Sequence, residues 1–296
     1  MRTHAALALT LLAASSFAVT ACGGDDATVG AGGAEPGASA PAPGDQKAEL
    51  EHIHGLGVDP GSGSLIVATH YGLFRAAKDE TKLQRVGRSR QDVMGFSVVG
   101  PGRFIGSGHP DPGQSSPPNL GLIESRDAGK SFENVSLLGK ADFHTLRSAG
   151  PQVYGFDGAS GKLMVSADGG RRWVARTPPI GVFDLAISPD DPKRVVVSTE
   201  KGLFASTDAG KRWRPERSDT AGLLAWTAAD RLVLVDGEGQ VSSSSNAAKS
   251  FAPVGTIGGP PSAFVADGED LYAALGDGTV VRSTDGGAGW VVRATP

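Results

Sequence analysis

Four stretches of this sequence repeat one pattern: SRDAGKSF (125–132), SADGGRRW (166–173), STDAGKRW (206–213) and STDGGAGW (283–290). A fifth stretch, SSNAAKSF (244–251), is a weaker copy. Successive copies begin 41, 40, 38 and 39 residues apart. A nearly constant period of this length is typical of propellers and solenoids, so the repeat decides the fold class before any other feature does.

The residue types in each copy predict a tight turn. Each aspartate can accept hydrogen bonds from N–H groups of the turn, and the glycine that follows can adopt a positive φ at low cost. The tryptophan that ends three copies can bury a large ring between neighbouring repeats. A calcium ion bound at each copy is a less favoured alternative, because one carboxylate is too few ligands. The predicted structural residues are Asp127, Asp168, Asp208, Asp285, Trp173, Trp213 and Trp290.

The pattern resembles the Asp-box, or BNR repeat, Ser-x-Asp-x-Gly-x-Thr-Trp, although Lys or Arg here often replaces residues near the Thr position. Proteins with this box include sialidases, sortilin-type receptors, photosystem assembly propellers and bacterial lipoproteins that are often named glycosyl hydrolases. The resemblance covers residues 51–296 and implies a β-propeller. The box specifies a turn and not a reaction, so it predicts no activity by itself.

Short apolar strands separated by turn signals precede each copy, which favours an all-β propeller over a helical fold. Counted from the innermost strand, six units begin near residues 52, 92, 142, 181, 222 and 261. The first unit has no recognisable box. We therefore predict a six-bladed β-propeller over residues 48–296.

The residues before the propeller have the features of an exported lipoprotein. Residues 1–21 carry one charge, Arg2, followed by an apolar run that predicts a signal peptide and not a spanning helix. Val-Thr-Ala-Cys at 19–22 resembles the lipobox of bacterial lipoproteins and implies lipidation of Cys22. Residues 22–47 are rich in Gly, Ala, Pro, Ser and Asp, which predicts a flexible, lipid-anchored linker. We expect a protein held by lipid on the outer side of the bacterial cell membrane.

Cysteine content and net charge argue against two classes of protein, those built on disulfide bonds and those that bind nucleic acid. Cys22 is the only cysteine, so the chain has no disulfide framework. The net charge of the 296 residues is -4, and removal of residues 1–21, with Arg2 as their only charged side chain, changes it to -5. Because this charge gives no basic surface, nucleic acid is not an expected partner.

The histidines are unevenly distributed. After His4 of the leader, all of them fall in the first three predicted units. Alignment of the inner strands puts His54, Met94 and His144 in one column, and His52, Asp92 and Asp142 in another. His70 and His109 close the second strands of their units. These positions share one predicted face, opposite the box turns, where the central channel is expected to open to ligands.

Such a cluster predicts a ligand or metal site. Imidazole suits copper, zinc and iron, and a thioether shifts the preference towards copper, so copper or another transition metal is the expected cofactor. Asp92 and Asp142 would orient the imidazoles. A polar ligand pocket without metal is the alternative. The predicted ligand or metal residues are His52, His54, His70, Met94, His109 and His144.

Two other functions stay open. A glycoside hydrolase acting on a glycan needs two carboxylates, for which Asp92, Asp142 and Glu200 are candidates. A true sialidase is disfavoured, because the Arg-Ile-Pro signature and a complete arginine triad are missing. An envelope protein-interaction scaffold is the third reading. The long connection 108–121 would form a flap over the predicted site, or is a tolerated insertion.

Overall fold

The computed structural model describes residues 49–50 and 52–296. The chain divides into two units, Met1–Ala40 and Pro41–Pro296, and the described residues belong to the second. The predicted signal peptide, Cys22 and the predicted linker lie outside the described residues. Within the described part of the chain, no helix combines the length and hydropathy needed to cross a membrane.

The second unit is a six-bladed β-propeller, as predicted: 24 strands form six four-stranded antiparallel sheets. The first two sheets, or blades, contain β1 (Ile53–Val58), β2 (Leu65–Thr69), β3 (Gly72–Ala76) and β4 (Gln84–Arg85), then β5 (Asp92–Gly100), β6 (Arg103–His109), β7 (Leu122–Ser125) and β8 (Glu133–Ser136). Blades 3 and 4 contain β9 (Phe143–Ala149), β10 (Gln152–Asp157), β11 (Lys162–Ser166) and β12 (Val174–Arg176), then β13 (Val182–Ile187), β14 (Val195–Thr199), β15 (Gly202–Ser206) and β16 (Arg214–Arg217). Blades 5 and 6 contain β17 (Leu223–Ala228), β18 (Arg231–Val235), β19 (Gln240–Ser244) and β20 (Ala252–Thr256), then β21 (Pro261–Asp267), β22 (Asp270–Leu275), β23 (Val280–Ser283) and β24 (Val291–Ala294).

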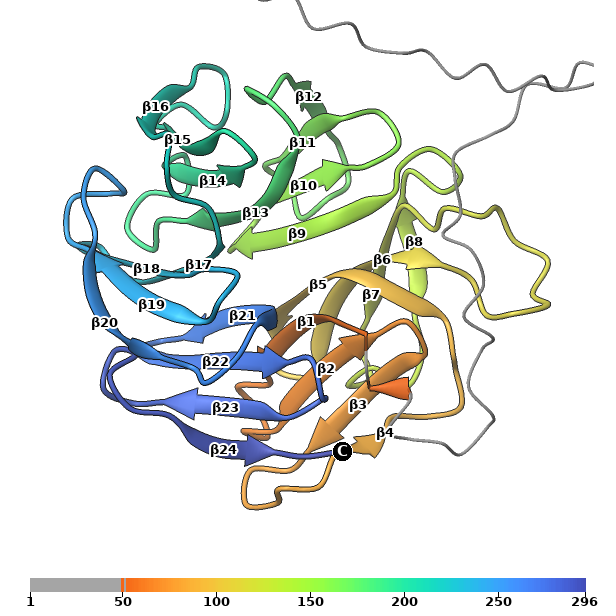
Figure 1. Ribbon diagram of the computed structural model, residues 1–296. Coiled ribbons are helices and arrows are strands. Elements are labelled where there is room, and N and C mark those ends of the chain that lie inside the picture. The colour runs from red at the N-terminus through yellow and green to blue at the C-terminus, as the bar shows by residue number, and fades with distance from the viewer. Residues whose placement is uncertain (1–48, 51) are drawn as a thin grey trace, which may run out of the picture. The chain divides into compact units, whose positions relative to one another are not determined.

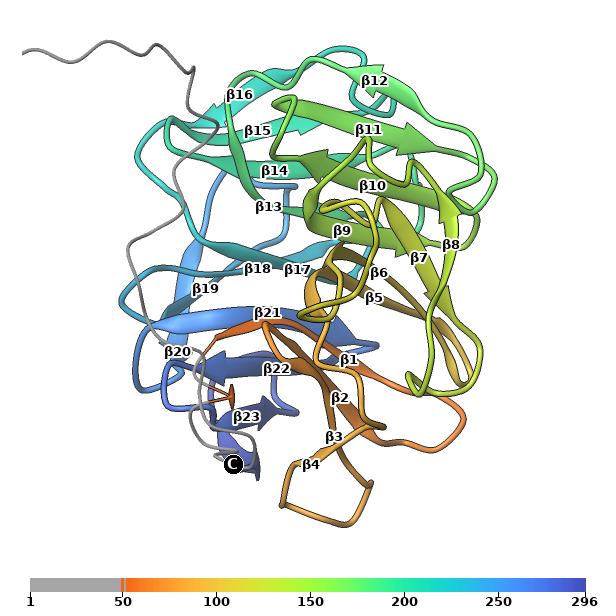
Figure 2. The same cartoon turned by 90° about the vertical axis from the view of Figure 1, so that its right-hand side faces the viewer.

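Strands follow chain order from the inside to the outside of every blade. The inner strands β1, β5, β9, β13, β17 and β21 contact one another in this order, and β21 contacts β1. Figure 1 shows the resulting ring of sheets, and Figure 2 shows the inner strands from the side. Since all six inner strands run in the same sense, their first residues lie at one end of the central channel and their last residues at the other.

Burial explains the sequence pattern of the strands. Every residue of β2 and of β14 is buried, because these second strands lie between the faces of neighbouring blades. The apolar clusters cross from blade to blade, and one of them joins Phe74 of β3 to Tyr272 of β22. The outermost strands are largely exposed, as in β12 and β24.

The ring closes between the first and last blades. Thr295 forms a parallel bridge with Lys82, and its N–H donates to the carbonyl oxygen of Thr81 at 2.7 Å. Nearby, the guanidinium of Arg293 donates to the carbonyl oxygen of Glu80 at 2.7 Å. The C-terminal end of the chain is therefore fastened along blade 1.

The repeated stretches form the turns between the third and fourth strands of blades 2 to 6. In blade 4, Ser206 Oγ accepts from the N–H of Gly210 at 2.9 Å, and Asp208 Oδ1 accepts from the N–H of Arg212 at 2.9 Å. Asn246 replaces the aspartate in blade 5, and its Oδ1 accepts a backbone N–H in the same way. Trp173, Trp213 and Trp290 are half-buried, and each packs against an apolar cluster that joins two neighbouring blades.

Candidate functional site

The five described histidines lie at the end of the channel where the inner strands begin. His54 and His144 are near the starts of β1 and β9, and His52 precedes β1. His70 directly follows β2, and His109 is the last residue of β6. Because second strands run antiparallel to inner strands, the end of β2 lies beside the start of β1, where the His70 N–H donates to the carbonyl oxygen of His52 at 3.4 Å.

Three of the predicted residues form a compact cluster, here called the His54 cluster: His54, His70 and Asp92. Asp92 is the first residue of β5, so the cluster joins blades 1 and 2. His70 Nδ1 lies 2.8 Å from Asp92 Oδ2, and His54 Nε2 lies 3.7 Å from Asp92 Oδ1. The rings of His54 and His70 meet edge-on at 4.4 Å. One ligand atom from each residue lies within 4.8 Å of the other two.

Two polar atoms of the His54 cluster are buried and unsatisfied. Neither His54 Nε2 nor Asp92 Oδ1 has a hydrogen-bond partner among the described residues. A buried polar atom in this state typically costs about 1–3 kcal/mol. Both atoms face the same short gap, so a single ion or water molecule placed there would satisfy both.

The environment also sets the protonation of the two imidazoles. Burial, together with the charges of the neighbouring histidines, lowers the pKa of His54 to about 4, although the charge of Asp92 acts in the opposite direction. His54 is therefore neutral at neutral pH and keeps a lone pair free for a ligand. The hydrogen bond that His70 donates to Asp92 raises the pKa of His70, which is more exposed than His54.

The other predicted residues lie near the cluster but have partners of their own. His144 Nε2 is 2.9 Å from Asp142 Oδ2, and the two form a separate pair. Burial acts to raise the pKa of Asp142, but the hydrogen bond and charge of His144 lower it overall. His109 Nδ1 is 2.8 Å from the carbonyl oxygen of Pro118.

Met94 and Glu200 are less closely tied to this site. Met94 is half-buried on β5, two residues after Asp92. Glu200 is exposed in the turn between β14 and β15, in blade 4. His52 is exposed, and its ring lies 5.4 Å from that of His70.

The long connection after β6 is attached to the histidine end of the channel at two points. Asp111 accepts hydrogen bonds from the hydroxyl of Ser89, at 2.9 Å, and from the N–H of Arg90. Further along the connection, Pro118 contacts His109. The connection thus lies beside the histidines, and its motion as a flap stays a prediction.

Sequence reasoning missed a buried carboxylate at this end. Glu49 is 2 % exposed and forms ion pairs with both Arg85 and Arg90. The Arg90 guanidinium also lies 5.4 Å from the ring of Tyr71. A single Glu before the first strand carries no sequence signal, because its partners lie about forty residues away and are brought to it only by the closed blade.

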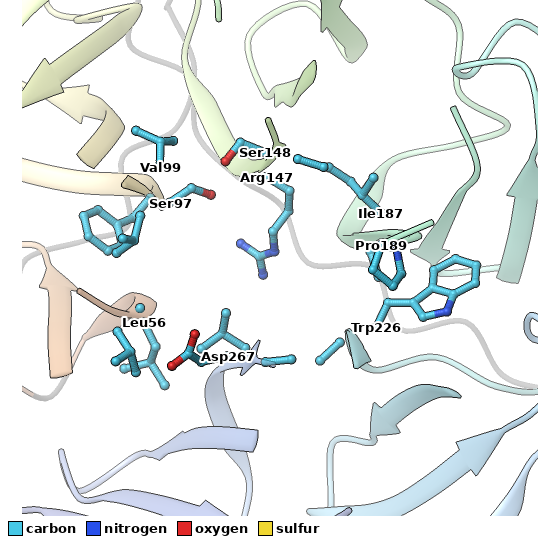
Figure 3. A pocket seen from close by; sticks show the side chains of 18 of the residues that line it. Leu56, Ser97, Val99, Arg147, Ser148, Ile187, Pro189, Trp226 and Asp267 are labelled. Carbon is cyan, nitrogen blue, oxygen red and sulfur yellow. The ribbon is translucent and has the colours of Figure 1, made fainter. Parts of the chain in front are cut away.

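A cavity lies at the opposite end of the channel. It has a volume of about 460 Å³ and is lined by the second halves of the inner strands and the turns that follow them. Figure 3 shows Arg147 reaching towards its middle, with Asp267 across from it. The sequence predicts ligand binding only at the histidine end, and this cavity was not predicted.

The comparisons with known proteins agree with the fold. The sequence matches no family model and no curated protein. Among solved structures, it resembles a GH74 xyloglucanase from Xanthomonas campestris, with TM-score 0.54, 17% identity, and coverage of 81% of this chain and 45% of that one. An ancestral GH74 enzyme gives TM-score 0.52, 15% identity, and coverage of 79% and 35%. A nidogen/laminin complex gives TM-score 0.61, 12% identity, and coverage of 79% and 93%.

This chain spans less than half the length of either GH74 structure. At identities of 12–17%, the likeness shows a shared propeller fold and does not transfer an activity. The class that fold and comparisons define is therefore the β-propeller, and the site has to be interpreted from its own chemistry.

Proposed function

We propose that this propeller binds one divalent transition-metal ion through His54, His70 and Asp92 and performs no covalent chemistry there. The observation that supports this most directly is the unsatisfied, buried pair His54 Nε2 and Asp92 Oδ1. An ion between these atoms would replace two unmet hydrogen bonds with two coordination bonds, and the neutral His54 ring would need no deprotonation.

The spacing of the ligand atoms supports the same proposal. Bonds from such an ion to imidazole nitrogen and carboxylate oxygen are about 2.0–2.2 Å long, which places two tetrahedral ligands about 3.4 Å apart. The observed separation of 3.7 Å between His54 Nε2 and Asp92 Oδ1 is close to this value. His70 would exchange its hydrogen bond to Asp92 for a bond to the ion. His52, beside His70, could supply a further ligand after rotation of its side chain.

The donor set favours a borderline metal. Two imidazoles and one carboxylate suit zinc, iron or copper(II), whereas copper(I) prefers sulfur ligands. Copper, which the sequence indicated through Met94, stays within the proposal as copper(II). The sequence of residues 1–47 adds the expectation that this site is held by lipid on the outer side of the membrane.

The hydrolase alternative has less support from the geometry. A glycosidase needs a carboxylic acid whose pKa is raised by its surroundings. The pKa of Asp142 is instead lowered, chiefly through His144 acting against burial. Asp92 accepts a hydrogen bond from His70, and Glu200 is exposed in another blade. The scaffold alternative has no specific surface in its favour.

Calorimetric titration with zinc and with copper(II) tests the proposal. We expect one equivalent of metal to bind the unmodified chain, and His54→Ala to weaken binding by about 100-fold or more, because loss of a residue that only supports a ligand already costs about 10–100-fold. His109→Ala is the matched control, because it removes an imidazole at the same end of the channel whose nitrogen is already held by Pro118. If both variants lose affinity equally, or if the unmodified chain binds no metal, the proposal is wrong.

A further inference from the structure

The cavity opposite the histidines carries only two charged side chains among the described residues that line it, Arg147 of β9 and Asp267 of β21. These strands belong to blades 3 and 6, which face each other across the ring. The cavity volume of about 460 Å³ is within the range of small-molecule sites. The two side chains differ in one respect: Arg147 already forms an ion pair within the described part of the chain, and Asp267 does not.

Arg147 is already neutralised within the protein. Its Nη2 donates to Asp184 Oδ1 at 2.8 Å, and the carboxylate of Asp184 is almost fully buried. Asp184 Oδ2 accepts from the N–H of Leu224 at 2.9 Å, so the carboxylate is fixed between β13 and β17. The ion pair holds the guanidinium in place at the cavity wall (Figure 3) and balances its charge.

Asp267 is not neutralised in this way. Among the described residues, its carboxylate accepts no hydrogen bond from a side chain and forms no ion pair, while its neighbour Asp270 is engaged by Arg282 at 3.0 Å. Burial and the negative charge of Asp270 raise the pKa of Asp267, and the positive charge of Arg282 acts against them. The Asp267 side chain is exposed at the end of β21. Among the described side chains that line the cavity, Asp267 is therefore the charged group without an ion-pair partner.

Apart from Ser97 and Ser148, the other side chains that line the cavity are apolar, although polar and apolar atoms contribute about equally to its surface. Leu56 of β1, Phe96 of β5 and Val265 of β21 come from three neighbouring blades, and Trp226 comes from β17. Figure 3 shows Leu56 and Trp226 on different parts of the wall. Such surface binds a flat or compact hydrocarbon body, because burial of apolar area is favourable. A carboxylate ligand would add a second negative charge to the cavity, whereas an ammonium group would neutralise Asp267.

We infer that this cavity is a second binding site, for a small organic amine whose ammonium group pairs with Asp267 and whose apolar body packs against Phe96 and Trp226. This site is separate from the proposed metal site, since the two occupy opposite ends of the inner strands. Failure of one proposal leaves the other standing.

Calorimetric titration of the full chain with tryptamine and with indole-3-propionate tests the inference, because the two probes share a ring and differ in charge. We expect tryptamine to bind about tenfold tighter, and Asp267→Asn to remove about tenfold of that affinity. Glu269→Gln is the control, since it removes a nearby exposed carboxylate outside the cavity lining. His54→Ala should bind tryptamine unchanged.

Three results would overturn the inference: no binding of tryptamine at millimolar concentration, equal binding by Asp267→Asn, or tighter binding of indole-3-propionate. The last result would assign ligand recognition to Arg147. A thermal melt of each variant shows that it is folded, and Asp267→Asn is suited to the test because, within residues 52–296, no side chain donates a hydrogen bond to this carboxylate.

Discussion

At the scale of single residues, the repeated turns show what a sequence pattern can and cannot predict. The hydrogen-bonding role of Asp208 followed from its residue type, because short carboxylates accept turn N–H groups. The equally direct role of Ser206, whose hydroxyl accepts from Gly210, was not predicted. A serine hydroxyl can donate or accept in many settings, so its residue type alone does not choose between them.

The same turns should make stability depend on pH. Hydrogen bonds from the Arg212 side chain and backbone hold the pKa of Asp208 well below its ordinary value of 3.8. A carboxyl whose pKa is lower in the folded state stabilises the fold above the unfolded value, and that contribution disappears as the pH falls through the folded one. Urea unfolding at pH values between roughly 6 and 2 should therefore show a shallower acid loss in Asp208→Asn than in the unmodified chain. If the free energy of unfolding falls equally with pH in both proteins, the Asp208 carboxylate does not contribute to the acid loss of stability.

At the scale of elements, the strands were predictable because a constant period and clear turn residues separate them. Blade 1 was identified although it lacks the repeated turn. The direction of individual side chains was not predictable. His144 occupies the same column of the strand alignment as His54, yet it pairs with Asp142 and stays outside the cluster. The alignment could not predict this difference, because it contains no information on side-chain torsion angles.

Two phenylalanines near the starts of neighbouring inner strands differ in burial, so their substitution tests which strand faces are packed and which are exposed. Phe143 on β9 is fully buried, and its ring lies 5.0 Å from that of Trp173. Phe183 on β13 is 56% exposed at the histidine end. Phe143→Ala should lower the free energy of unfolding by about 3–5 kcal/mol, as loss of a buried ring does. Phe183→Ala should change it by about 0.5 kcal/mol or less. Equal losses in chemical denaturation would contradict the assigned faces.

At the scale of the whole propeller, the ring gives the channel two chemically different ends. The sequence predicted six blades and a histidine-rich end, because both follow from strand count and strand direction. It did not predict the cavity, whose two charged residues, Arg147 and Asp267, are 120 positions apart and share no motif. Such a cavity depends on how far the blades stand from the axis, which periodicity does not encode.

The closed ring also explains why the proposed metal site needs an intact fold. His54 and His70 come from blade 1 and Asp92 from blade 2, so no single blade contains the three ligands. The contact of β1 with β5 sets their spacing. A metal bound there would join the two blades at the end where the chain enters the propeller.

Anomalous diffraction from crystals grown with zinc tests the central claim most directly. We expect one strong peak about 2.0–2.2 Å from His54 Nε2 and from an oxygen of Asp92, with His70 as the third ligand. Ordered water between His54 and Asp92, with zinc absent or bound only at other residues, would contradict it.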